Sequence, residues 1–133
     1  MVKASAKWTD AERFIGTASS GHAMVVDAGA EKTGTGPMEL VLVGLCSCTA
    51  IDVVNILRKK REPFTGVEVH AEAERANEAP KVYTSIKLVY RVRGNVSRKA
   101  LEDAVKLSEE KYCSVAGMLK STAKITYEIE LVP

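Results

Sequence analysis

The stretch from Met38 to Arg61, MELVLVGLCSCTAIDVVNILRKKR, decides the fold of this chain. Apolar or small residues fill every face of a helix between Leu40 and Ile51, which predicts a helix that is buried on all sides. Pro37 suits the first helical position, after a loop rich in glycine and threonine at Gly29–Gly36. Such a helix needs cover on more than one side, so we expect a sheet on one side and a partner subunit on the other.

The composition indicates one domain over residues 1–133, in the cytoplasm. A chain of 133 residues is long enough to bury its own core. We expect no membrane span, because about 20 apolar residues are needed and Asp52 and Asn55 interrupt the run. The N-terminal residues contain no continuous apolar segment of the kind that a secretory signal needs. A net charge of +2, with acids and bases interspersed, predicts no nucleic-acid partner.

The remaining sequence predicts strands on both sides of the helix, and a further helical region. Alternation of apolar and polar residues, with turn residues between the runs, predicts strands over Arg13–Ala18, His22–Asp27, 67–74, 82–92 and 123–131. Ser97 should cap a helix that reaches about Lys111. The apolar stripe of this helix is expected to consist of Leu101, Ala104, Val105 and Leu107.

Three cysteines are the candidate reactive groups, and an odd number argues against a structural disulfide framework. Cys46 and Cys48 point about 200° apart on a helix, so together they can neither form a disulfide nor bind one metal ion. The remaining candidate pair is one of these two with Cys113. Gly44, one turn before Cys48, leaves a gap beside the sulfur where a small substrate could enter.

Each of these residues also has a simpler interpretation. A free cysteine is often just a buried small hydrophobe, and Asp52, one turn after Cys48, should oppose thiolate formation. Cys113 lies near a predicted helix start, where backbone N–H groups lower the pKa of a thiol. Glu39 lies on the far side of the helix from Cys48 and could assist it only through a bend or from another subunit. His22 is either a donor to an anion or a solvated strand end, and a metal site of Cys48, Cys113 and His22 matches no standard zinc spacing.

Three segments, GPMELVLVGLCSCTAIDVV, ERANEAPKVYT and LSEEKYCSVAGMLK, resemble the osmotically induced protein C and organic hydroperoxide resistance (OsmC/Ohr) family. The order of elements along nearly the whole chain is similar as well. The resemblance implies an α+β fold that forms an intertwined homodimer, with curved antiparallel sheets around central buried helices and active sites at the subunit interface. It also implies that Cys48 reacts with a hydroperoxide and that Cys113 resolves the sulfenic acid, which leaves Cys46 as an extra cysteine.

The leading interpretation is a thiol-dependent peroxidase in oxidative or osmotic stress defence, which uses Cys48 and Cys113 and is reduced again by an external dithiol. This chemistry needs no metal and no organic cofactor. Organic hydroperoxides are the expected substrates, because the pocket beside Gly44 should have apolar walls. These walls are expected to comprise Val41, Leu45, Val115, Met118 and Leu119.

Two departures from the family pattern keep a rival interpretation open. The better-characterised peroxidases of the family have a glutamate directly after the proline that opens the helix, where this chain has Met38 followed by Glu39. They also carry an arginine in the N-terminal strand region that activates the thiolate, and no arginine occurs between Phe14 and Asp27. The rival is a dimeric protein of the same fold that binds a small apolar ligand without efficient peroxidase activity.

Overall fold

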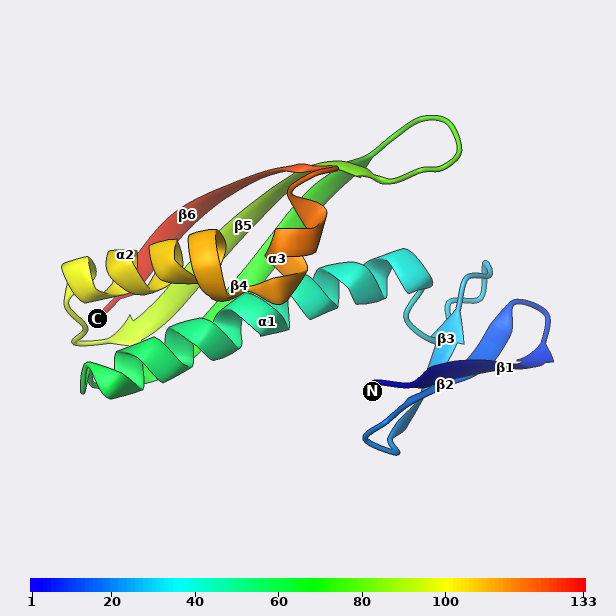
Figure 1. Ribbon diagram of the computed structural model, residues 1–133, viewed down its shortest axis with the longest axis horizontal. Helices are drawn as coiled ribbons and strands as arrows, with labels where there is room; N and C mark the ends of the chain where they lie inside the picture. Colours follow the sequence, from blue (N-terminus) through cyan, green and yellow to red (C-terminus); the bar gives the residue numbers. More distant parts are fainter. The chain divides into compact units, whose positions relative to one another are not determined.

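The computed structural model describes all residues, Met1–Pro133, which form two compact units, unit 1 (Met1–Val43) and unit 2 (Gly44–Pro133) (Figure 1). The elements in chain order are β1 (Ala4–Asp10), β2 (Arg13–Ala18), β3 (Ala23–Asp27), α1 (Pro37–Lys59), β4 (Phe64–Arg75), β5 (Tyr83–Gly94), α2 (Arg98–Leu107), the π-helix η1 (Ser108–Tyr112), α3 (Ser114–Leu119) and β6 (Lys124–Val132). The predicted α+β class is confirmed. One domain over residues 1–133 stays a prediction.

Unit 1 is built on a three-stranded antiparallel sheet in the order β1–β2–β3. The turn between β2 and β3 contains Gly21, whose φ of 82° favours glycine. Strand β1 was missed in the sequence, because all of its residues are exposed and it therefore has no apolar face. Asp27, at the end of β3, is buried and accepts hydrogen bonds from the backbone N–H groups of Gly29 and Thr33 at 2.7 and 3.0 Å.

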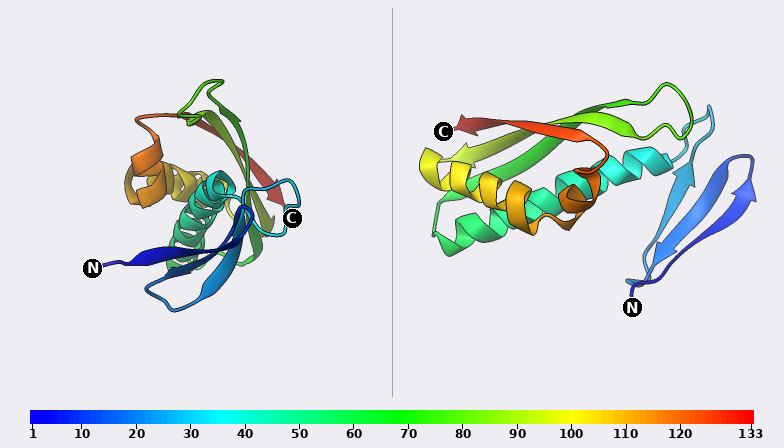
Figure 2. Two further views of the ribbon diagram at one scale, coloured as in Figure 1. Left: turned by 90° about the vertical axis from the view of Figure 1, so that its right-hand side faces the viewer. Right: turned by 45° about the horizontal axis from the view of Figure 1, so that its top comes forward.

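Unit 2 contains a second sheet in the order β4–β5–β6, with helices on one of its faces (Figure 2). Strands β4 and β5 form an antiparallel pair, whereas β6 runs parallel to β5. The sheet is therefore mixed, and the expectation of purely antiparallel sheets is wrong for this unit. A parallel neighbour requires a crossover connection, which α2, η1 and α3 provide.

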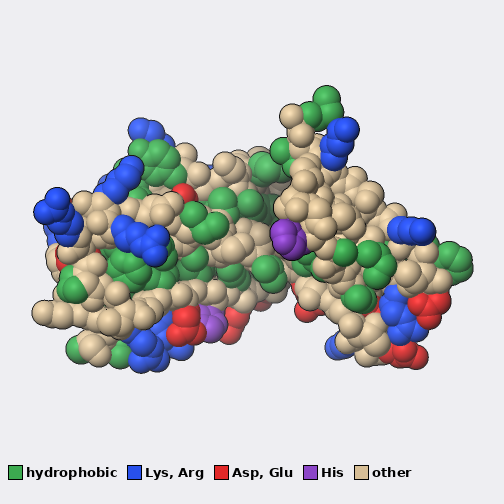
Figure 3. All heavy atoms as spheres, turned by 90° about the horizontal axis from the view of Figure 1, so that it is seen from below, with side chains coloured by type: hydrophobic (Ala, Val, Ile, Leu, Met, Phe, Trp, Pro, Cys, Tyr) green, Lys and Arg blue, Asp and Glu red, His purple; other side chains and the backbone are tan.

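Helix α1 buries one face only within this chain. Leu45, Thr49, Val53 and Leu57 are fully buried and lie four residues apart along the helix. Ile51, in contrast, is 59% exposed. Figure 3, which views the molecule from below, shows hydrophobic side chains at the surface of unit 2 among charged ones. The chain itself therefore covers one side of α1, and cover of the other side by a partner subunit stays a prediction.

Helix α2 begins as the sequence predicts, with Ser97 as N-cap accepting a hydrogen bond from the Ala100 N–H at 3.3 Å. Three residues of its predicted stripe are buried, namely Leu101, Ala104 and Val105. Leu107 is 39% exposed instead. The π-helix η1 starts directly after Leu107, and its buried residues are Ser108 and Glu109.

By length and composition, α1 could also cross a membrane, since its most apolar part has a mean hydropathy of 2.2. Length and composition alone therefore do not distinguish a membrane span from a core helix here. The buried face of α1 nevertheless packs in the core of unit 2, and core helices of soluble proteins pass the same test.

Candidate functional site

Cys113 occupies the junction between two helical segments. The π-helix η1 ends there with a hydrogen bond from the Cys113 N–H to the Ser108 carbonyl at 2.8 Å. Cys113 is also the N-cap of α3, and its Sγ accepts a hydrogen bond from the Ala116 N–H at 3.4 Å. The side chain is 4% exposed. Hydrogen bonds with the preceding segment η1 and with the following helix α3 thus hold Cys113 in place.

Cys48, in the middle of α1, is half-buried, and it lies near enough to Cys113 to raise the pKa of the Cys113 thiol. Both are free cysteines. The fold therefore joins the two predicted site cysteines, which are far apart in the sequence. Cys46 is also free and half-buried, and burial raises the pKa of its thiol.

The surroundings of Cys113 raise the pKa of its thiol to about 12, mainly because burial disfavours the thiolate. The neighbouring Cys48 and the charge of Glu109 act in the same direction. The Ala116 N–H opposes them and lowers the pKa. The lowered pKa that the sequence predicted for a helix start is therefore wrong, since burial outweighs the backbone donor.

A chain of buried polar side chains runs beside the cysteine pair. The Thr49 hydroxyl lies 2.6 Å from the Tyr90 hydroxyl and 2.7 Å from the Ser108 hydroxyl. Ser108 is in contact with Asp52 at 2.9 Å, and Tyr90 donates to the Glu109 carboxyl group. Asp52, which we expected to oppose a thiolate on Cys48, is thus held by Ser108.

Sequence reasoning missed the role of this chain, although the sequence carried a signal for it. Ser108 continues the spacing of Leu101, Ala104 and Val105, so a hydroxyl falls on an apolar stripe. Thr49 likewise interrupts the apolar run of α1. Buried hydroxyls need hydrogen-bond partners, and polar residues at core positions on different elements are therefore candidates to meet.

Glu39 and His22 lie in unit 1. Glu39 accepts a hydrogen bond from the Gly36 N–H at 2.9 Å, which closes the first turn of α1 as a helix cap. His22 is exposed, next to Gly21 in the turn before β3. For both residues, a part in the chemistry of Cys48 stays a prediction.

The arginine that begins β2 is already engaged within unit 1. Arg13 lies just before the interval in which we expected the activating arginine of the family. Its guanidinium forms ion pairs with Asp10 at 2.6 Å and with Glu31 at 2.9 Å. These two carboxylates compensate its charge locally.

The predicted apolar walls differ widely in exposure. Leu45 is fully buried and belongs to the core, which contradicts its expected place in an open pocket. Met118 is 76% exposed, and Val41, in unit 1, is half-buried. A Cβ added at Gly44 would meet no atom within 4 Å beyond its chain neighbours and the backbone of its own helix, and a substrate gap beside Cys48 stays a prediction.

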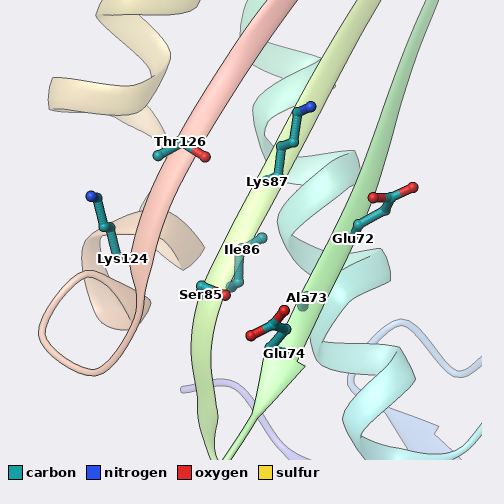
Figure 4. A pocket seen from close by; sticks show the side chains of 8 residues that line it. All are labelled: Glu72, Ala73, Glu74, Ser85, Ile86, Lys87, Lys124 and Thr126. Carbon is teal, nitrogen blue, oxygen red and sulfur yellow. The ribbon is translucent and has the colours of Figure 1, made fainter.

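Outside the cysteine pair, the structure shows surface hollows but no metal centre. No group of three or more His, Cys, Asp or Glu side chains could hold a metal ion. A hollow of about 450 Å³ lies on the face of the β4–β5–β6 sheet that is turned away from α1. Figure 4 shows the side chains that line it. Its lining comprises Glu72, Ala73, Glu74, Ser85, Ile86, Lys87, Lys124 and Thr126.

Comparison with known proteins places the chain in a family. The family profile described as OsmC-like protein matches residues 29–128. Protein YhfA of Escherichia coli strain K12 is 41% identical over 132 residues, which cover 98% of each chain. The crystal structure of a hypothetical protein from Aquifex aeolicus VF5 is 35% identical, with a TM-score of 0.87 over 100% of this chain and 98% of that one.

An organic hydroperoxide resistance protein shares the fold at a greater distance. OhrB of Bacillus subtilis is 16% identical, with a TM-score of 0.68 over 98% of each chain. The fold therefore extends from close relatives to proteins with little sequence identity. The family profile and the close relatives confirm the resemblance seen in the sequence: this chain belongs to the OsmC-like protein family.

Proposed function

We propose that this chain is a thiol-dependent peroxidase that reduces organic hydroperoxides with Cys48 and Cys113. The observation that carries the proposal is the proximity of these two free thiols, one on α1 and the other at the start of α3, which is close enough for Cys48 to raise the pKa of Cys113. Membership of the OsmC-like family supports a stress-related redox role. The three free thiols also fit the reducing cytoplasm.

In the proposed reaction, the disulfide forms in two steps, an oxidation by the peroxide and a condensation. The Cys48 thiolate attacks one peroxide oxygen, the O–O bond breaks, and the alkoxide takes up a proton and leaves as the alcohol. Cys48 is now a sulfenic acid, oxidised by two electrons. The Cys113 sulfur then attacks the Cys48 sulfur, the S–O bond breaks, and the hydroxide leaves as water with the Cys113 proton. An external dithiol returns two electrons and restores both thiols.

The high pKa of Cys113 gives it a second role before oxidation. Burial keeps Cys113 protonated, and a protonated thiol can donate its hydrogen bond to a thiolate on Cys48. The donor would thus offset part of the missing positive charge, since Arg13 is paired with Asp10 and Glu31. We propose Cys48 as the attacking residue for this reason.

The test begins with fully reduced protein and one equivalent of cumene hydroperoxide. We expect the loss of two protons in the intact mass and a Cys48–Cys113 disulfide in peptides mapped under denaturing, thiol-blocking conditions. Hydrogen peroxide at equal concentration should react more slowly. Free thiols at both positions after the reaction would refute the peroxidase and favour the binding of an apolar ligand.

We further propose a homodimer, which would cover the exposed part of α1. Ile51 is 59% exposed although it lies in a long apolar helix, and a hollow of about 360 Å³ adjoins it. Large apolar side chains left exposed in this way mark interfaces. The partner subunit expected from the sequence would therefore pack on this face.

Replacing Ile51 by glutamate should therefore convert the dimer to monomers, because a charge would be buried without a partner in the interface. Sedimentation equilibrium of Ile51→Glu against the unchanged protein measures this. Lys106→Glu, on an exposed position of α2, is the control and should keep the native mass. An unchanged mass for Ile51→Glu would place any interface elsewhere.

A further inference from the structure

Five side chains form an unbroken series of hydrogen bonds through the interior of unit 2. In spatial order they are Asp52, Ser108, Thr49, Tyr90 and Glu109. The oxygen–oxygen distances are 2.9 Å for Asp52–Ser108, 2.7 Å for Ser108–Thr49 and 2.6 Å for Thr49–Tyr90, and Tyr90 contacts Glu109 directly. Thr49, Tyr90 and Ser108 are fully buried, and Glu109 is 7% exposed.

This series is one hydrogen short if both of its carboxyl groups are ionised. Four oxygen–oxygen contacts each need one hydrogen, but the three hydroxyls supply only one each. With both carboxyl groups ionised, one contact would place two oxygens together with no hydrogen between them. Burial raises the pKa of Tyr90, and its contact with Glu109 acts in the same direction, so that tyrosine keeps its hydrogen. A fourth hydrogen must therefore come from Asp52 or Glu109.

We propose that these five side chains are a proton wire, which holds one proton shared between Glu109 and Asp52. With the proton on Glu109, every hydroxyl donates toward Asp52. With the proton on Asp52, every hydroxyl donates toward Glu109. Both directions satisfy all four contacts, so reversing the hydroxyls moves the proton from one end to the other.

The two ends of the wire lie in different surroundings. Glu109 is buried near Cys113, and its charge raises the pKa of that thiol. Asp52 lines a surface hollow of about 380 Å³ that also contains Lys59, Lys60 and Tyr112. The wire thus joins the neighbourhood of the buried Cys113 thiol to the protein surface.

The use of this wire in catalysis rests on the proposed peroxidase. Cys48 loses one proton on becoming a thiolate, and one proton must return when the alkoxide leaves as the alcohol. The condensation with Cys113 then needs no further proton, because water forms from the hydroxide and the Cys113 hydrogen. One stored proton therefore matches the demand of one turnover, and the charge of Glu109 at one end of the wire lies near enough to Cys113 to raise the pKa of its thiol.

Other titratable or charged groups surround the wire and must be considered in any pH experiment. They are Cys48 on α1, Cys113 at the start of α3, Tyr127 on β6 against the Tyr90 ring, Lys120, which donates to the Glu109 carbonyl, and Lys59 and Lys60 beside Asp52.

The wire predicts a specific pH dependence of unfolding. The folded chain holds one more proton than the unfolded chain, whose carboxyl groups are ionised above about pH 5. Stability should therefore fall as the pH rises, with the unfolding equilibrium constant increasing about ten-fold per pH unit as long as the folded chain keeps the proton. Chemical denaturation at several pH values and one protein concentration measures this slope.

Glu109→Gln and Asp52→Asn should each remove this contribution to the slope. An amide N–H₂ at either end supplies the missing hydrogen, so all four contacts are satisfied without the extra proton. Glu110→Gln, which neutralises the exposed neighbour, is the matched control and should keep the native slope. An infrared band of a protonated carboxyl group should be present in the native protein and the control, and absent from both amide variants.

The outcomes separate the wire from the peroxidase, because no peroxide is used. Equal slopes in the native protein and both amide variants, or no band of a protonated carboxyl group, would overturn the wire. If the slope and the band behave as expected while cumene hydroperoxide leaves both thiols reduced, the wire stands and the proposed peroxidase fails. Two amide variants at opposite ends keep the test informative if one of them does not fold.

Discussion

Cys48→Ser should abolish the hydroperoxide-dependent disulfide and lower the rate of peroxide consumption by about a thousand-fold or more. A serine hydroxyl is a far weaker nucleophile than a thiolate, and Cys113 cannot replace Cys48 because burial raises its pKa to about 12. The measurement is the consumption of cumene hydroperoxide with an external dithiol in excess. Thermal unfolding of the same variant verifies that the fold is intact.

The other two cysteines provide matched controls for this prediction. Cys113→Ser should react once with the peroxide and then stop at a Cys48 sulfenic acid, which a dimedone label would trap. Cys46→Ser should retain the native rate, because Cys46 is no part of the contact between the other two thiols. Full activity in Cys48→Ser, or loss of activity in Cys46→Ser alone, would show that Cys48 is not the residue that attacks the peroxide.

Leu57→Ala should lower the free energy of unfolding by about 2–5 kcal/mol. Leu57 is fully buried on the inner face of α1, where the helix packs in the core of unit 2. Truncation removes buried apolar surface and leaves a cavity that neighbouring side chains fill only in part. Denaturant titration of the native protein and the variant gives the difference.

Leu107→Ala is the control with the same chemical change. Leu107 is 39% exposed, so its truncation should cost less than about 1 kcal/mol. Equal losses in the two variants would mean that Leu107 becomes buried in the assembled protein. The hollow beside Asp52, which Leu107 also lines, would then be part of an interface.

Much of the fold could be predicted from local sequence patterns. The start of α1 at Pro37, the cap at Ser97 and the end of β5 at Gly94 follow from the conformations that these residues favour. The alternation in β4, β5 and β6 reports which side chains face the core. Strand β1 could not be found in this way, because an entirely exposed strand has no pattern of burial.

The exposed face of α1 shows where local patterns mislead. A run of apolar residues does not say whether the chain itself or a second copy covers them. Within one chain, Leu45 and Leu57 are buried and Ile51 is exposed, although all three are equally apolar in the sequence. Only the packing of α1 on unit 2 distinguishes the two faces.

Some features of the candidate site likewise follow from the sequence, and others depend on the packing of the chain. The sequence by itself determined the family, through its segments around Cys48 and Cys113, because motifs depend only on residue type and spacing. The tertiary structure alone decided that the pKa of Cys113 is raised and that Glu109 lies at the end of a series of hydroxyls. Burial and hydrogen bonding between distant elements depend on how the chain packs, and no local spacing encodes them.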